Sequence, residues 1–173
     1  MKHTKLMGLR SLFAFVAAIG FAGISNVSGA TSGNLVLDGE VDLILSIAVT
    51  PEPGASSMSP STLVSSLAIA NVYEICNDAD GYTVSVSSSN GVGDAANSGV
   101  LTGATAAEDL SYSLTYGGTS VGFVNGSAQV TDSSSKTPDF GELKSIDIAF
   151  DGTSSNLAAD SYSDTLTFTI AAK

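Results

Sequence analysis

The 173-residue sequence predicts an all-β fold, an immunoglobulin-like antiparallel β-sandwich. Apolar and polar residues alternate with a period of two in segment after segment, which is typical of strands with one buried face. Gly, Asn, Asp and Ser separate these segments and indicate turns. Hardly any segment beyond the first 30 residues has a helical period. We therefore expect roughly seven or eight short strands in one domain.

Residues 1–30 are predicted to be a signal peptide. Basic residues precede an apolar run from Ser11 to Ile24, and Ser28 and Ala30 form the small-x-small pattern of a signal peptidase site. The run is too short and too rich in Gly and Ala for a membrane span, a retained N-terminal anchor being the alternative. We expect export through the periplasm, a new N-terminus near Thr31 and no stable membrane insertion after cleavage.

The segment 31–50 is predicted to be an amphipathic strand that precedes a sandwich domain covering residues 51–173. Its odd positions from 35 onward are apolar except for one glycine, and its even positions are mostly polar, so one face is a continuous apolar row. Pro51 and Pro53 end the strand. A terminal strand of this kind can complete its own sandwich or that of another molecule, so its apolar row is the candidate binding site. The row consists of Leu35, Leu37, Gly39, Val41, Leu43, Leu45 and Ile47.

Further strands are expected wherever apolar residues return after a loop. The first of these is apolar enough to be buried on both faces. The expected strands cover residues 67–76, 82–86, 100–101, 110–116, 121–123, 146–150 and 162–170. Loops or turns are expected at residues 51–60, 77–81, 88–98, 117–118, 131–138 and 151–152.

The charge balance argues against two classes of partner. Three of the six Lys and Arg residues, and none of the 17 acidic ones, lie in the predicted signal peptide, so the exported chain has a formal charge of 3 − 17 = −14. A surface this acidic repels nucleic acids and anionic lipid head groups. We therefore expect neither as a partner.

The side-chain inventory argues against an enzyme. The only histidine, His3, lies in the predicted signal peptide, and the single cysteine, Cys76, can form no intramolecular disulfide. Triads that need histidine and zinc sites that contain it are therefore excluded, and we expect Cys76 to be a small semi-buried side chain. No metal and no cofactor is expected. Tyr162 is predicted to be a structural tyrosine corner that bonds upstream backbone.

Acidic residues occur in two patterns that invite a functional interpretation. Asp78 and Asp80 lie in an Asn-Asp-Ala-Asp-Gly stretch, but further calcium ligands at EF-hand spacing are missing, so turn chemistry accounts for them. Asp38, Glu40 and Asp42 share one face of the first strand. They are interpreted as a solvated strand face and not as catalytic carboxylates.

Three segments resemble the spore coat protein U family, the archaic chaperone–usher pilins. Residues 38–47 (DGEVDLILSI) are similar to the N-terminal Gly-x-Val-x-x-x-Leu-x-Ile strand of that family. Residues 160–170 (DSYSDTLTFTI) are similar to its closing Gly-x-Tyr-x-Asp-Thr-Leu/Val-x-Val strand, and residues 81–86 (GYTVSV) are a weaker match. The family often has a disulfide near the N-terminal strand, which this chain cannot form. An Ala-Ala-Lys tail also extends beyond the closing strand.

The resemblance implies a sandwich that lacks its final strand and is completed by donor-strand exchange. A periplasmic chaperone fills the groove first, and an outer-membrane usher then inserts the N-terminal strand of the next subunit. The expected function is a structural subunit of a surface fimbria or pilus with a role in adhesion or biofilm, whose partners are copies of itself or related pilins. The alternative is a self-contained secreted sandwich that binds carbohydrate or a host surface. A carboxylate hydrolase is the third hypothesis.

Overall fold

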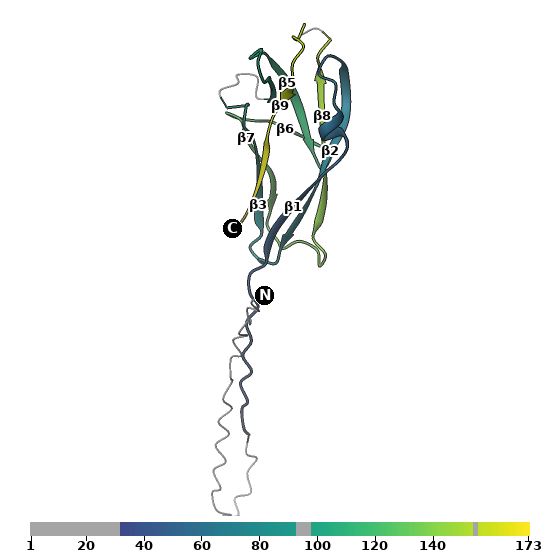
Figure 1. Cartoon of the computed structure of the whole chain (residues 1–173). Coiled ribbons are helices and arrows are strands. Elements are labelled where there is room, and N and C mark those ends of the chain that lie inside the picture. Colours follow the sequence, from purple (N-terminus) through teal and green to yellow (C-terminus); the bar gives the residue numbers. More distant parts are fainter. Residues whose placement is uncertain (1–31, 93–97, 154–155) are drawn as a thin grey trace, which may run out of the picture. The chain divides into compact units, whose positions relative to one another are not determined.

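The computed structural model describes residues 32–92, 98–153 and 156–173. The predicted signal peptide lies outside these residues. Glu40–Lys173 form one compact unit, and the described residues before it, 32–39, are exposed and have no regular secondary structure. Figure 1 shows the strands of the compact unit as two facing layers. Among the described residues, no helix is long and apolar enough to cross a membrane.

The compact unit is an antiparallel β-sandwich. Its strands and one short helix are β1 (Leu45–Pro51), α1 (Gly54–Ser57), β2 (Leu63–Cys76), β3 (Tyr82–Ser88), β4 (Gly99–Gly103), β5 (Asp109–Tyr116), β6 (Thr119–Val121), β7 (Ser127–Ser133), β8 (Glu142–Asp151), β9 (Tyr162–Ser163) and β10 (Leu166–Ala172). The larger sheet has the order β1-β2-β8-β5-β4-β9, with β6 paired to β5, and the smaller sheet has the order β10-β3-β7. The predicted fold class is thereby confirmed.

The strand order matches an immunoglobulin-type sandwich from which one strand is missing. If β1, β2, β3, β5, β8 and β10 are named A to F in chain order, the larger sheet contains the sequence A-B-E-D and the smaller sheet pairs C with F. A complete sandwich of this type adds strand G to the free side of F. Here β10 takes the place of F, and no strand of the described chain lies on that side.

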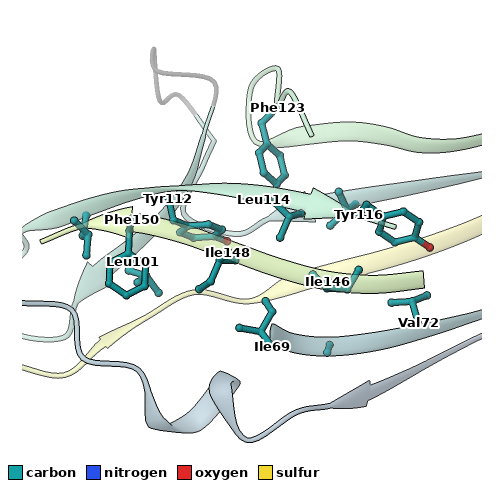
Figure 2. Close-up of a cluster of buried hydrophobic side chains, with 13 residues drawn as sticks. Ile69, Val72, Leu101, Tyr112, Leu114, Tyr116, Phe123, Ile146, Ile148 and Phe150 are labelled. Atoms are coloured by element: carbon teal, nitrogen blue, oxygen red, sulfur yellow. The ribbon is translucent and has the colours of Figure 1, made fainter. Parts of the chain in front are cut away.

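The core fills the space between the two sheets. Figure 2 shows Ile146, Ile148 and Phe150 of β8 and the alternate residues of β5 in the same cluster as Ile69 and Val72 of the neighbouring strand β2. The smaller sheet contributes Val86, with Phe168 packed against the cluster. In β5 and β8 these residues repeat every second position, because strands alternate their side chains between faces, whereas an irregularity between Ala68 and Ala70 interrupts the alternation in β2.

One carboxylate lies inside this core. Glu74 of β2 is fully buried, and its side chain accepts hydrogen bonds from Tyr82 Oη at 2.9 Å, from Thr131 Oγ1 at 2.8 Å and from Tyr116 Oη. Glu74 and Tyr116 belong to the larger sheet, whereas Tyr82 and Thr131 belong to the smaller one. The carboxylate therefore joins the two sheets through hydroxyl donors, as a buried polar group requires.

Two of the predicted turns, 77–81 and 117–118, are confirmed, whereas the short helix α1 lies inside the predicted loop 51–60 and residues 93–97 of the predicted loop 88–98 lie outside the described residues. At 77–81, the amide of Asp80 donates to Asp78 Oδ1 at 3.0 Å, and Gly81 has a φ of +94°, a conformation that favours glycine. Gly117 and Gly118, with φ of +55° and +80°, form the hairpin between β5 and β6. These features are the Asx-turn and glycine chemistry that the sequence indicated.

Several predicted boundaries are wrong: β2 begins at Leu63 and not at 67, β6 ends at Val121 and not at 123, and β8 begins at Glu142 and not at 146. The first strand begins at Leu45 and not at 35, because its partner β2 ends at Cys76, directly opposite Leu45. The predicted loop 131–138 overlaps β7, a mostly polar strand whose half-buried Ala128 and Val130 contact the core. The predicted last strand is divided into β9 and β10 around Asp164, whose side chain binds neighbouring backbone amides.

Candidate functional site

A groove lies between β1 and β10, the two strands at which the facing sheets end. In the described chain, β1 pairs with β2 alone and β10 pairs with β3 alone, so each has one free edge. At one end Leu45 and Ile47 of β1 and Ile170 of β10 pack against the same small cluster. Toward the other end the groove is open.

The open part of the groove is a cavity of about 190 Å³ with mainly apolar walls. Seven elements contribute to its lining, β1, α1, β2, β4, β5, β8 and β10, so it reaches from the free edges to the core. Characteristic wall residues are Val49, Ile69, Leu101, Ile148, Leu166 and Phe168. Such a cavity fits aliphatic side chains, because it offers them apolar surface and few polar groups that would lose water.

Asp164 holds the polar end of the groove in place. Its carboxylate accepts hydrogen bonds from Ser88 Oγ at 2.6 Å, Tyr112 Oη at 2.6 Å, Ser89 Oγ at 2.9 Å and the Asn90 amide at 3.2 Å. Burial alone would raise the pKa of Asp164, but these donors together lower it below its ordinary value. The donors come from both sheets, so Asp164 fixes the start of β10 against its neighbours. This role of Asp164 is not predicted from the sequence.

The loop before β9 is fixed by a second carboxylate and by the predicted tyrosine corner. Hydrogen bonds from the amides of Ala106 (2.8 Å) and Thr105 (2.6 Å) lower the pKa of Asp160 to about 2. The Tyr162 hydroxyl lies 3.1 Å from the carbonyl oxygen of Ala158, so the tyrosine corner is confirmed. The same hydroxyl lies 3.0 Å from Glu108 Oε2. The rim of the groove is therefore a fixed structure.

The structure divides the predicted apolar row into two parts. Leu45 and Ile47 lie in β1 and are half-buried against the core. The residues before them are exposed: Leu35 by 83 %, Leu37 by 84 %, Val41 by 85 % and Leu43 by 58 %, with Gly39 also exposed. We call residues 32–41 the arm. The arm has an apolar row and no strand partner among the described residues.

Asn77 marks where the arm joins the sandwich. Its side-chain amide donates to the carbonyl oxygen of Asp42 at 2.8 Å, and its Oδ1 accepts the Ile44 amide at 2.7 Å. Its backbone amide also donates to the Ile44 carbonyl oxygen at 3.1 Å. We call these contacts the Asn77 clamp. Residues 42–44 are therefore fixed to the end of β2, whereas the sequence predicts Leu43 as part of the free strand.

The other candidate residues have structural surroundings. Cys76 is buried, and its Sγ lies 3.4 Å from the amide of Asp78. Asp78 and Asp80 belong to the turn described above. No group of three or more potential metal ligands occurs within the parts of the chain that the structure describes.

Comparison with known proteins gives no further guide. Neither the models of protein families nor the curated proteins include a match to this chain. The functional interpretation therefore depends on the groove and the arm.

Proposed function

We propose that this protein is an exported structural subunit of a surface fibre, a fimbria or pilus, in which the arm of one copy completes the sandwich of the next. One observation carries the proposal. The free edge of β10 borders an apolar cavity at the position where a complete immunoglobulin-type sandwich has strand G. An added strand there would gain ladder hydrogen bonds from its backbone and apolar contacts from alternate side chains.

The arm has the chemistry that such a site requires. Its apolar side chains alternate with mostly polar residues, a pattern typical of a strand with one buried face. Nevertheless more than four-fifths of each of these side chains is exposed, namely of Leu35, Leu37 and Val41. Burial of an aliphatic side chain contributes about 1.5–3 kcal/mol, so the three together supply roughly 4.5–9 kcal/mol before the cost of association. Ladder hydrogen bonds add about 0.5–1.5 kcal/mol each. These terms are large enough for stable binding of a short strand.

The positions of the groove and the clamp favour an open chain of subunits. The last residue of β10, Ala172, pairs with Tyr82, and Tyr82 directly follows the turn that begins at Asn77. The Asn77 clamp and the end of β10 therefore lie at the same end of the sandwich, which we call the clamp pole. Leu166 lies toward the opposite pole. When an arm pairs antiparallel to β10 of a neighbour, its C-terminal end lies at Leu166 of that neighbour. The clamp pole of the donor subunit then meets the opposite pole of the neighbour. This contact is head-to-tail and does not close, so it generates a filament.

Assembly factors belong to the proposal for a physical reason. An apolar groove beside a free strand edge, together with an apolar arm, is prone to uncontrolled pairing. A periplasmic chaperone that covers the groove and an outer-membrane usher that exchanges it for an arm, as in the chaperone–usher pilins, would prevent this. Adhesion or biofilm formation is the role proposed for the fibre.

The test uses the full chain, exported from a bacterial host together with the assembly factors of its source. Leu37→Asp/Val41→Asp would bring unpaired charge into the apolar cavity, so this variant should stay monomeric while wild type gives an oligomer ladder. Asp38→Asn/Glu40→Gln, on the other face of the arm, is the matched control and should assemble. Circular dichroism checks that both variants are folded. A wild-type protein that remains monomeric at high concentration and does not bind a peptide of residues 34–43 would contradict the proposal and favour the self-contained binding module.

A further inference from the structure

We infer the register of this interaction: the arm lies antiparallel to β10 with Gly39 directly opposite Phe168. The inference rests on the proposed function and adds which residues select this pairing of the arm with β10 over other possible pairings. Three features of the arm and of β10 agree on it: their lengths, the sizes of their inward residues and the chemistry of their outward residues.

The lengths match. β10 has seven residues, Leu166–Ala172. The arm has seven residues from its first leucine, Leu35, to Val41, and the Asn77 clamp holds the chain from Asp42 onward. A seven-residue arm segment therefore covers the whole free edge of β10 when Val41 lies opposite Leu166. The clamp prevents residues beyond Val41 from entering while the donor sandwich stays intact.

The inward residues match in size. Along β10 they are the half-buried Leu166, Phe168, Ile170 and Ala172, and along the arm they are Leu35, Leu37, Gly39 and Val41. In the antiparallel pairing, Phe168 meets the inward arm residue that has no side chain, and Ala172 meets a leucine. The Phe168 ring packs 6.0 Å from the ring of Tyr116, between centroids, so its position is fixed from the core side. A glycine opposite a large aromatic side chain leaves room for both strands to approach.

The outward residues agree with the same register. The outward row of β10 is Thr167, Thr169 and Ala171, of which only Ala171 is apolar. The outward row of the arm opposite them is Glu40, Asp38 and Val36, of which only Val36 is apolar. The pairing that places Gly39 at Phe168 also places Val36 at Ala171 and leaves both acidic residues beside threonine hydroxyls. Directly opposite side chains are the strongest cross-strand neighbours, so this agreement favours the register.

Other pairings lose these matches. A shift by two residues in one direction puts Leu37 opposite Phe168 and Val36 opposite Thr169. A shift by two residues in the other direction puts Val41 opposite Phe168 and Val36 opposite Lys173. A parallel arm with Gly39 at Phe168 would pair Asp42 with Ala171, although residues 42–44 are fixed by the Asn77 clamp. A shift by one residue would turn the acidic row inward. Phe168 thus acts as the residue that determines the register, and Gly39 is its complement.

Cysteine cross-linking in the assembled full-length protein tests the register. Asp38→Cys/Thr169→Cys places two outward thiols directly opposite each other, whereas Asp38→Cys/Ala171→Cys and Asp38→Cys/Thr167→Cys represent the shifted registers. Mild oxidation should give a reduction-sensitive covalent ladder for the first pair, at least several-fold stronger than for the other two. Asp38→Cys alone controls for the buried Cys76.

The outcomes separate this inference from the proposed function. Assembly with stronger cross-linking at a shifted pair, or with equal cross-linking at all three, would overturn the register and leave the fibre proposal intact. Absence of assembly in the wild type would overturn both.

A size exchange gives an independent check. Gly39→Leu should reduce assembly at least tenfold, and Gly39→Leu/Phe168→Ala should restore much of it. Gly33→Leu, outside the seven paired residues, is the matched control and should assemble normally. Normal assembly of Gly39→Leu would overturn the inferred contact.

Discussion

Replacement of Glu74 by leucine should destabilise the sandwich through the hydroxyl groups that surround it. Glu74→Leu removes the acceptor of Tyr82, Tyr116 and Thr131, and the first two are almost fully buried. A buried donor without a partner costs about 1–3 kcal/mol, so the two phenols together cost roughly 2–6 kcal/mol. Removal of the buried carboxylate offsets part of this loss in the free energy of unfolding, because the cost of removing the carboxylate from water no longer opposes folding. We expect a net loss of about 2–4 kcal/mol.

The measurement is denaturant unfolding of the folded monomeric variant, followed by circular dichroism. A companion variant, Glu74→Leu with Tyr82→Phe, Tyr116→Phe and Thr131→Val, removes acceptor and donors together and should recover most of the loss, because no polar group is then left unpaired. Glu142→Leu is the matched control on the same sheet. Its carboxylate is partly exposed and pairs with Lys144, so its loss should cost less than about 1 kcal/mol.

Two results would refute this reasoning. If Glu74→Leu is as stable as wild type, the buried carboxylate does not hold the two sheets together. If the companion variant is no more stable than Glu74→Leu, unpaired hydroxyls are not the cause of the loss.

Three further predictions concern titration and the clamp. Burial, and to a lesser extent hydrogen bonds to carboxylates, raise the pKa values of Tyr82, Tyr112 and Tyr116 in the folded protein. The free energy of unfolding should therefore fall above about pH 10, where the same tyrosines ionise in the unfolded chain. Ultraviolet absorbance should show that these three tyrosines ionise only as the chain unfolds. The folded-state pKa of Asp164 is lowered, so its contribution is present above the unfolded value near 3.9 and is lost as the pH falls through the folded-state pKa. Asp164→Asn should therefore melt below wild type at pH 7 and close to it at pH 2, and an equal gap at both values would argue against this. Asn77→Ala removes two side-chain hydrogen bonds worth about 0.5–1.5 kcal/mol each, so the amide of Ile44 should exchange hydrogen much faster while core amides stay protected.

The alternation of side chains was sufficient to predict the fold class and most strands. It succeeded for β3, β5 and β8, where apolar residues at every second position supply the core. It failed for β7 because that strand has only two half-buried apolar residues, Ala128 and Val130, among polar ones. Its position depends on pairing with β3, which a local pattern does not contain.

The candidate site was only partly predictable for the same reason. The apolar row from Leu35 to Ile47 was visible in the sequence, but its division at the Asn77 clamp depends on a contact across more than 30 residues. The groove itself depends on strand order, since β10 pairs with β3 on one side and with no described strand on the other. Asp164 had a weak signal, its place before a Thr-Leu-Thr-Phe strand, whereas four of its five donor groups come from residues 88–90 and Tyr112, which are more than 50 residues away in the sequence.

The clamp also determines how a pulling force would enter each subunit. In the proposed fibre, tension on a donated arm reaches its own sandwich at residues 42–44 and passes directly into β1. The seven residue pairs between β1 and β2 run along the direction of pull, so they would be sheared together and not unzipped one by one. Rupture would then require all of these pairs to fail at once, which gives a fibre of such subunits high mechanical strength.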